Sequence, residues 1–432
     1  MKGSERGKIL ILAFTLAVVM LGFGLVIPIF PFYIEELGAS GRELGLLVAT
    51  SALLEFIFAP LWGGVSDRIG RKPVLMVGIF GYGLSALLFG LATQLWMLFA
   101  ARALSGLLSS AALAASMAYV GDTTSEADRS SGMGTLGAAM ALGLILGPAM
   151  GGALAGDSLS RPFFIAAALS LLALLLILLL LPESKDFGFR FSDVGLKQIR
   201  NSDFGMGNGG WRRYLDHNPF GGLKAGLVGP LGFLFFMVAL FSFALSNFEA
   251  VFGLYAHQKF DYGPEKVGMI LMVVALVSTV GKAALTGPAT RRWGEERVIR
   301  ASLIAGSVGF GVLLLANTFF TILLATAFFI LSKTLLRPAS LALISKRTTT
   351  GQGTVMGLSN SFSSLGRIAG PIWAGFVFDR HVDLPYLSGS IIMFIGFVLS
   401  LIWIKPHADR GLEAKVATNR EAARWQSGKV AK

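Results

Sequence analysis

Gly143-Leu-Ile-Leu-Gly147-Pro148 occurs a second time, 223 residues later, as Gly366-Arg-Ile-Ala-Gly370-Pro371. A second phrase, Gly63-Gly-Val-Ser-Asp67-Arg68-Ile-Gly70-Arg71-Lys72, is echoed 224 residues later between Gly287 and Glu296. Both offsets are about half of the 432 residues of the chain. Two unrelated phrases that repeat at one spacing predict two homologous halves in tandem.

The composition indicates a membrane protein. Hydrophobic residues make up 54% of the chain, charged residues 14%, and the mean hydropathy is +0.69. A chain this apolar does not form a water-soluble domain. It contains no cysteine, which excludes disulfides, iron–sulfur clusters and thiolate metal sites, and its four histidines form no ligand pattern. We therefore expect no metal and no cofactor.

Apolar windows of about 19 residues divide the chain into twelve predicted spans and four regions. The regions are an N-terminal bundle (1–182), a cytoplasmic linker (183–226), a C-terminal bundle (227–405) and a cytoplasmic tail (406–432). The predicted fold class is an all-α integral membrane protein with six helices in each bundle. The spans are 9–33, 43–63, 73–93, 95–119, 132–155, 162–182, 227–257, 267–287, 298–316, 319–345, 356–377 and 387–404.

The distribution of Lys and Arg predicts the orientation. With the N-terminus inside, the cytoplasmic segments hold most of the basic residues, which places both termini in the cytoplasm. The lipid bilayer is thus the expected partner, and the localisation is the cell membrane. The same bias explains the net charge of +12, so nucleic-acid binding is not needed to account for it.

The phrase from Gly63 to Lys72 lies in the predicted cytoplasmic turn between spans 2 and 3. Its glycines, Gly70 included, permit a tight turn. Asp67 can accept hydrogen bonds from an opposing helix N-terminus or pair with an arginine across the bundle, and such charges form a latch. Alternatively, Arg68, Arg71 and Lys72 only set the topology. In the echo Arg291 replaces Asp67, so a second latch cannot have the same polarity.

Span 5 continues Gly143 and Gly147 with Pro148, Gly151 and Gly152. Small residues at this spacing allow close helix packing, and the proline frees a backbone carbonyl and allows a bend. By itself GxxxG indicates only helix packing.

These phrases together resemble the major facilitator superfamily. The turn phrase resembles the loop signature of that superfamily, and the full span-5 phrase resembles the motif of its drug:proton antiporters. Span 1, from Leu21 to Pro31, is similar to the first-span signature of the twelve-span antiporters. The chain is most similar to the quinolone-type multidrug exporters through Ser246–Tyr255 in span 7 and Leu336–Ala339 in span 10.

Among the charged residues within predicted spans, we expect Glu249, Arg102 and Glu55 to carry the chemistry. Glu249 lies between Phe248 and Phe252 with no basic residue in mid-helix beside it, so an apolar setting favours its protonated form. The resemblance places it at the span-7 carboxylate implicated in proton and cationic-drug binding. Arg102 in span 4 must find carbonyls, water or a carboxylate. The resemblance associates it with proton transfer, and a structural arginine is the alternative.

The chain departs from the quinolone-type pattern in span 10, where Thr334 replaces the second carboxylate. Glu55 in span 2 can supply the missing acid, or it can neutralise Arg102 or Lys333. Arg337, with Arg367, is expected to pair internally. We expect Glu249, Phe248, Phe252, Glu55, Thr334 and Arg337 to line the substrate cavity.

The resemblance implies a proton-coupled antiporter that exports lipophilic, often cationic drugs by alternating access, without enzymatic activity. The coupling residues would be Glu249, Glu55 and Arg102, and the proton gradient would replace a cofactor, since no phosphate-binding loop is present. We expect a monomer. An exporter of an endogenous metabolite, sugar or siderophore is the alternative within transport, and a non-transporting membrane receptor is the alternative outside it.

Overall fold

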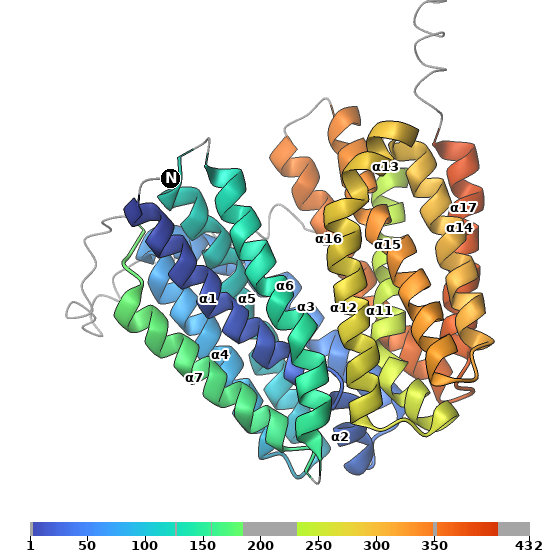
Figure 1. Cartoon of the computed structure of the whole chain (residues 1–432), viewed down its shortest axis with the longest axis horizontal. Helices are drawn as coiled ribbons and strands as arrows, with labels where there is room; N and C mark the ends of the chain where they lie inside the picture. Colours follow the sequence, from blue (N-terminus) through green and yellow to red (C-terminus); the bar gives the residue numbers. More distant parts are fainter. Residues whose placement is uncertain (1–2, 126–127, 157, 185–230, 349–351, 405–432) are drawn as a thin grey trace, which may run out of the picture.

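The computed structural model describes residues 3–404 apart from 126–127, 157, 185–230 and 349–351, and the regular elements within these residues are α-helices. Twelve long helices form two bundles (Figure 1). This arrangement confirms the predicted fold class. The predictions for the linker beyond Ser184 and for the tail fall outside the described residues.

The first bundle contains α1 (Gly3–Val26), α2 (Phe30–Glu36), α3 (Gly41–Ile69), α4 (Arg71–Gly90), α5 (Leu95–Thr123), α6 (Arg129–Ala155) and α7 (Arg161–Leu180). The second contains α11 (Gly232–Phe260), α12 (Pro264–Ala284), α13 (Thr286–Trp293), α14 (Glu295–Leu314), α15 (Phe319–Arg347), α16 (Gln352–Phe378) and α17 (Leu384–Trp403). By length and composition, eleven of the described helices can cross a membrane, and α16 is the twelfth long helix.

The observed elements differ from the predicted spans at two short helices, α2 and α13. The first predicted span, 9–33, is divided between α1 and α2, because Pro28 lacks the backbone N–H that would continue α1, whereas Pro31 lies in the first turn of α2, where that N–H is not needed. The span predicted to end at 287 ends at Ala284 and is followed by α13. In both halves a glycine with positive φ lies directly before the next long helix: Gly70 (104°) before α4 and Gly294 (77°) before α14. The echoed turn therefore has a similar backbone conformation in both halves.

In each half the repeated glycine phrase allows the fifth long helix to pack closely on the first: α6 on α1, and α16 on α11. A Cβ at Gly143 would lie 2.5 Å from the Ala17 carbonyl oxygen, and one at Gly147 would lie 2.6 Å from the Gly24 Cα, both in α1. In the second half, a Cβ at Gly370 would lie 2.6 Å from the Phe243 carbonyl oxygen in α11. Therefore α6 lies on α1 as α16 lies on α11, with backbones too close for a side chain.

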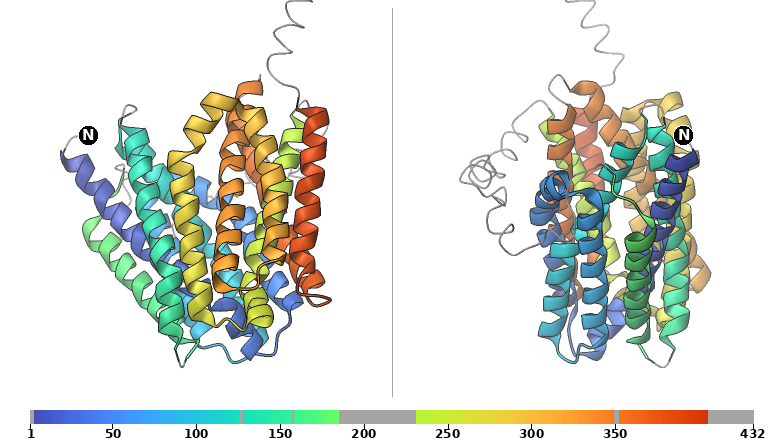
Figure 2. Two further views of the ribbon diagram at one scale, coloured as in Figure 1. Left: turned by 45° about the vertical axis from the view of Figure 1, so that its right-hand side comes forward. Right: turned by 90° about the vertical axis from the view of Figure 1, so that its left-hand side faces the viewer.

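The two bundles meet at one end and separate at the other (Figures 1 and 2). At the closed end, a Cβ at Gly45 of α3 would overlap the Pro371 carbonyl of α16, and one at Gly268 of α12 would overlap the Pro148 carbonyl of α6. Towards the other end, Gly63 in α3 and Gly137 in α6 have open space where a Cβ would lie. We call this the open end; α1 begins there and α17 ends there.

The buried apolar residues follow the same division. One cluster contains Leu12, Tyr119 and Ile177 and lies wholly within the first half. The other joins Tyr33 and Leu44 of the first half to Phe248 and most of the second-half core. The halves therefore share an apolar core only at the closed end.

Candidate functional site

Glu249 of α11 pairs with Lys333 of α15, whose Nζ lies 3.2 Å from its Oε1. The Glu249 side chain is 54% exposed and that of Lys333 is 10% exposed. The sequence predicted an apolar setting for Glu249, and the structure differs, because a cation from another helix lies beside it. Lys333 follows the phenylalanine-rich start of α15, and nothing in α11 indicates that the two would meet.

Glu55 of α3 pairs with Arg367 of α16, which links the two halves. Two parallel contacts join them, at 3.0 Å (Nη2 to Oε2) and 3.3 Å (Nη1 to Oε1), in the fork geometry that suits a carboxylate and a guanidinium. Glu55 therefore neutralises neither Arg102 nor Lys333. Arg367 is paired, as predicted, but with the other bundle.

Lys282 at the end of α12 and Arg337 of α15 are exposed, and neither forms a hydrogen bond or ion pair with a residue that the structure describes. The internal pairing predicted for Arg337 is thus absent from the described part of the chain. Arg337 lies near Arg367, and Lys282 lies near both Arg337 and Glu249. These neighbours join into one group between the bundles, which we call the central site: Glu55, Glu249, Lys282, Lys333, Arg337 and Arg367.

Phe248, Phe252 and Thr334 lie outside the central site, contrary to the prediction that they line the cavity. Phe248 and Phe252 are buried in the second bundle, with ring centroids 5.0 Å apart. They are four residues apart on one face of α11, and the direction of Glu249 lies about 100° from that of Phe248 and about 60° from that of Phe252. Thr334 is buried, and its hydroxyl donates to the Ile330 carbonyl oxygen at 2.7 Å. None of the three presents a free group to a substrate.

Arg102 lies against aromatic rings. Its guanidinium carbon is 4.2 Å from the centroid of Phe30 and 5.7 Å from that of Phe89. Its buried Nε has no hydrogen-bond partner among the described residues. A cation on the faces of two rings is held by cation–π attraction rather than by a carboxylate.

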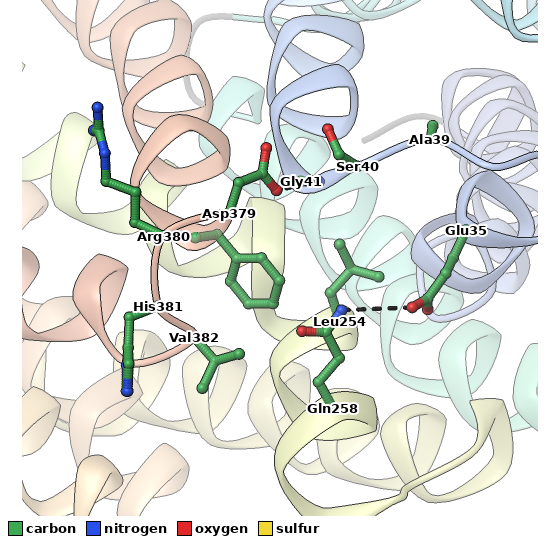
Figure 3. Close-up of a pocket in the computed structure, with 11 residues that line it drawn as sticks. Glu35, Ala39, Ser40, Gly41, Leu254, Gln258, Asp379, Arg380, His381 and Val382 are labelled. Atoms are coloured by element: carbon green, nitrogen blue, oxygen red, sulfur yellow. Dashed lines mark hydrogen bonds between the residues drawn. The ribbon is translucent and has the colours of Figure 1, made fainter.

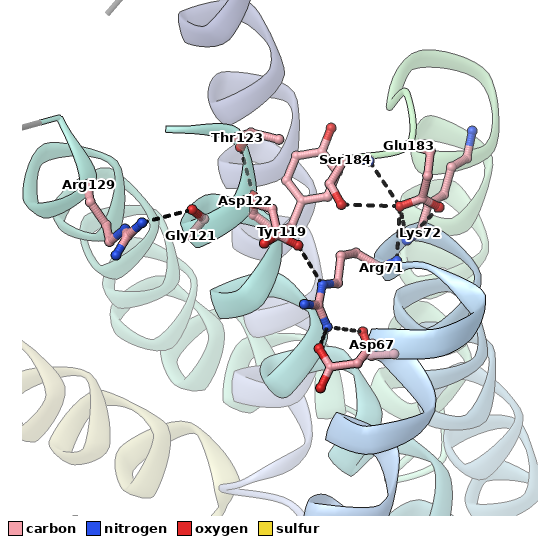
Figure 4. A network of polar contacts seen from close by, with 11 residues as sticks. Asp67, Arg71, Lys72, Tyr119, Gly121, Asp122, Thr123, Arg129, Glu183 and Ser184 are labelled. Atoms are coloured by element: carbon pink, nitrogen blue, oxygen red, sulfur yellow. Dashed lines mark hydrogen bonds and ion pairs between the residues drawn. The ribbon is translucent and has the colours of Figure 1, made fainter. Parts of the chain in front are cut away.

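The latch residues form a network within the first half (Figure 4). Arg71 is buried, with its Nη1 2.6 Å from Asp67 Oδ1 and its Nε 2.8 Å from Asp122 Oδ2. The Glu183 carboxylate accepts from the backbone N–H groups of Arg71 (2.9 Å) and Lys72 (3.2 Å), which caps α4. Arg71 therefore ties α3 to α5, and the Asp67 side chain remains 65% exposed.

The second half contains an ion pair at the positions of Arg71 and Asp122, with the charges exchanged. Position 71 corresponds to Glu295 and position 122 to Lys346, at the 224-residue offset. The Lys346 Nζ lies 2.5 Å from Glu295 Oε1. The basic–acidic pair of α4 and α5 is thus an acidic–basic pair between α14 and α15. The expected difference in polarity concerned Arg291 at the position of Asp67, and it stays a prediction.

The closed end is joined by hydrogen bonds from α3 to α16 (Figure 3). Asp379 accepts from the backbone N–H groups of Gly41 (2.7 Å) and Arg42 (3.0 Å). On the other side of a hollow of about 510 Å³, Gln258 Nε2 lies 3.5 Å from Glu35 Oε1. The sequence analysis missed Asp379, Glu183 and Lys282, of which Asp379 and Glu183 join elements far apart in the chain. No local pattern marks them.

Comparisons with known proteins agree with this architecture. The chain matches the sequence model of the Major Facilitator Superfamily over residues 12–286 and 234–430. It is 33% identical to Multidrug resistance protein 2 of Bacillus subtilis, over 92% of this chain and 96% of that protein. It is 26% identical to the quinolone resistance protein NorA of Staphylococcus aureus, over 91% and 96%. Among solved structures, the nucleoside transporter NupG has a TM-score of 0.71 at 16% identity, covering 92% of this chain and 99% of that one.

Two six-helix bundles around an intramembrane charged site define a membrane transporter of the alternating-access type. The chain belongs to the Major Facilitator Superfamily.

Proposed function

We propose that this protein is a proton-coupled exporter of lipophilic compounds, cationic drugs among them. Its similarity to multidrug resistance proteins over nearly its whole length supports multidrug export. The observation that carries the proposal is Glu249, a half-exposed carboxylate in the middle of α11, held by one cation. A carboxylate in such a position can bind either a proton or a cationic group, but not both at once.

This exclusion gives the exchange its direction. When Glu249 is ionised, it attracts a cationic group of a substrate entering from the cytoplasm. When it takes up a proton on the outside, that attraction is lost and the substrate leaves. The protonated carboxyl also stops attracting Lys333, so the pair that joins α11 to α15 weakens at the same step.

We assign the open end to the cytoplasm, so the described conformation is inward-facing. The open end carries the basic residues Arg68, Lys72, Arg129, Arg291 and Arg292, as the positive-inside rule requires of cytoplasmic loops. Both termini are then cytoplasmic, and the protein resides in the cell membrane as a monomer. In the outward-facing state the exposed Asp67 carboxylate, with Arg68 and Arg71, closes the cytoplasmic side.

The test is drug susceptibility in an efflux-deficient bacterial host. Cells that express the wild-type chain should tolerate several unrelated lipophilic drugs, and cells with Glu249→Gln should not. Glu36→Gln, an exposed acid at the closed end, is the matched control and should behave as wild type. Equal susceptibility with and without the wild-type protein would reject multidrug export.

A further inference from the structure

The hollow of about 510 Å³ at the closed end lies between the two halves of the chain (Figure 3). The first half contributes Glu35 and the turn 39–41, and the second half contributes Leu254 and Gln258 of α11 with residues 378–382. None of the six residues of the central site is among the residues that line it. We call it the outer hollow, because it lies at the end that faces the outside when the open end faces the cytoplasm. Its volume suits a drug-sized molecule.

The carboxylate of Glu35 faces the outer hollow and has spare capacity for hydrogen bonds. Within the described residues its partners are the Gln258 Nε2, 3.5 Å from Oε1, and the His257 Nε2, 4.0 Å from Oε2. Both contacts are long, and the Glu35 side chain is 37% exposed. A carboxylate accepts up to about four hydrogen bonds, so a donor on a ligand finds free lone pairs here. Asp379 differs, since its two oxygens already accept from N–H groups of α3.

The basic residues that line the outer hollow do not neutralise Glu35. The Arg380 guanidinium carbon lies 4.1 Å from the centroid of the Phe376 ring. His381 Nδ1 accepts from the backbone N–H of Asp383 at 3.2 Å. Both basic side chains point away from Glu35 (Figure 3). The charge that the hollow presents to a ligand is therefore negative.

The rest of the wall includes three apolar side chains, those of Leu254, Phe378 and Val382. We propose that the outer hollow is a second binding site, which takes organic cations of drug size from the outside and inhibits the transporter. The positive group of the ligand pairs with Glu35, and its apolar body covers the three apolar side chains. The ligand acts without being transported, so this inference goes beyond the proposed export function.

Inhibition follows from the position of the outer hollow. Glu35 belongs to the first half and Leu254 and Gln258 belong to the second, so the walls separate when the closed end opens. A ligand that touches both walls binds the inward-facing conformation and shifts the population towards it. At about nine times its Kd, the ligand raises the ratio of inward-facing to outward-facing molecules about tenfold. Export slows because release to the outside requires the outward-facing conformation.

The experiment uses propidium, an aromatic dye whose positive charges keep it from crossing a bilayer. The purified protein carries spin labels at Thr93 and Asn317, which are exposed in turns of the closed end, and is held at a pH at which both distance populations are present. Propidium should increase the short-distance population of the wild type. In Glu35→Gln the same increase should need at least about tenfold more propidium, the effect of one charge-assisted contact.

Two further variants locate the site. Ala39→Phe keeps the Glu35 carboxylate and fills part of the outer hollow, so it should weaken the response as well. Glu36→Gln removes the same charge from the neighbouring residue, which does not line the hollow, and should respond as the wild type does. In right-side-out membrane vesicles preloaded with a cationic dye, external propidium should slow energised efflux by the wild type and Glu36→Gln at lower concentrations than by Glu35→Gln and Ala39→Phe.

Three results would overturn the inference: an increase of the long-distance population by propidium, an equal response in the wild type, Glu35→Gln and Ala39→Phe, or a response that is lost in Glu249→Gln and kept in Glu35→Gln, which would place the dye in the central site. The spin-label measurement does not depend on transport. If the vesicles show no efflux without propidium while the labels respond as expected, the export function fails and the second site stands.

Discussion

Asp379 at the end of α16 accepts hydrogen bonds from the first two backbone N–H groups of α3, of which that of Gly41 is 2.7 Å away. These N–H groups have no partner within their own helix, and the helix N-terminus carries partial positive charge. At the closed end, the Asp379 carboxylate of the second half thus holds the N-terminus of α3 in the first half by hydrogen bonds.

Asp379→Ala should loosen the closed end and favour the conformation open at that end by about 0.5–2 kcal/mol, the usual cost of losing a helix cap. Spin labels at Thr93 and Asn317, both exposed in closed-end turns, would report a longer distance population. Asp383→Ala is the control, because Asp383 pairs with Lys259 inside the second half. A distance distribution that changes equally in both variants would refute the fastening role.

Glu249→Gln should abolish drug-induced proton release in proteoliposomes that contain a pH dye, for every substrate tested. The amide cannot exchange a proton at ordinary pH, although a neutral drug should still bind. Glu55→Gln should retain coupling, because Glu55 serves as the partner of Arg367. If Glu55→Gln instead removes coupling and Glu249→Gln keeps it, the assignment of the proton carrier is reversed.

Gly151→Ala should destabilise the first bundle by about 1–3 kcal/mol, because its Cβ would overlap the Leu25 carbonyl oxygen in α1. Gly137→Ala in the same helix meets open space and should be neutral or stabilising by about 0.5–1 kcal/mol. Thermal unfolding in detergent compares the two. Equal losses would mean that close packing of α6 on α1 does not limit stability.

Arg71→Gln should cost about 3 kcal/mol of unfolding free energy, because it leaves the largely buried Asp122 without its cation. Lys72→Gln should cost less than about 1 kcal/mol, since within the described residues its half-buried side chain donates to a single acceptor, the Leu178 carbonyl. Exchanging the pair, Arg71→Asp with Asp122→Arg, should recover part of the loss. No recovery in that double variant would show that Arg71 acts through something other than this pair.

The elements of the fold were predictable because their signals are local. Apolar runs of membrane-spanning length give the twelve helices, and the two repeated phrases give the halves. The division of the first span was missed although Pro28 was visible, because hydropathy alone does not register a broken helix.

The site was predictable only in part. Glu249 and Glu55 stand out as acids within apolar runs, but their partners Lys333 and Arg367 come from other helices, so one sequence does not pair them. The sequence also did not predict that Phe248 and Phe252 pack inward. Helix α11 is apolar on nearly every side, so no hydrophobic periodicity shows which of its faces is buried. Asp379 has no counterpart in the first half, where Gly156 occupies the matching position.

The exchanged charges of Arg71–Asp122 and Glu295–Lys346 bear on why the halves form one polypeptide. In a dimer of identical six-helix chains, both copies carry the same residue at every position, so the pair between the equivalent helices has the same order of charges in both. Fusion of two copies into one chain frees each from that constraint. The α4 position is then basic in one half and acidic in the other, a difference between the halves that no dimer of a single sequence can have.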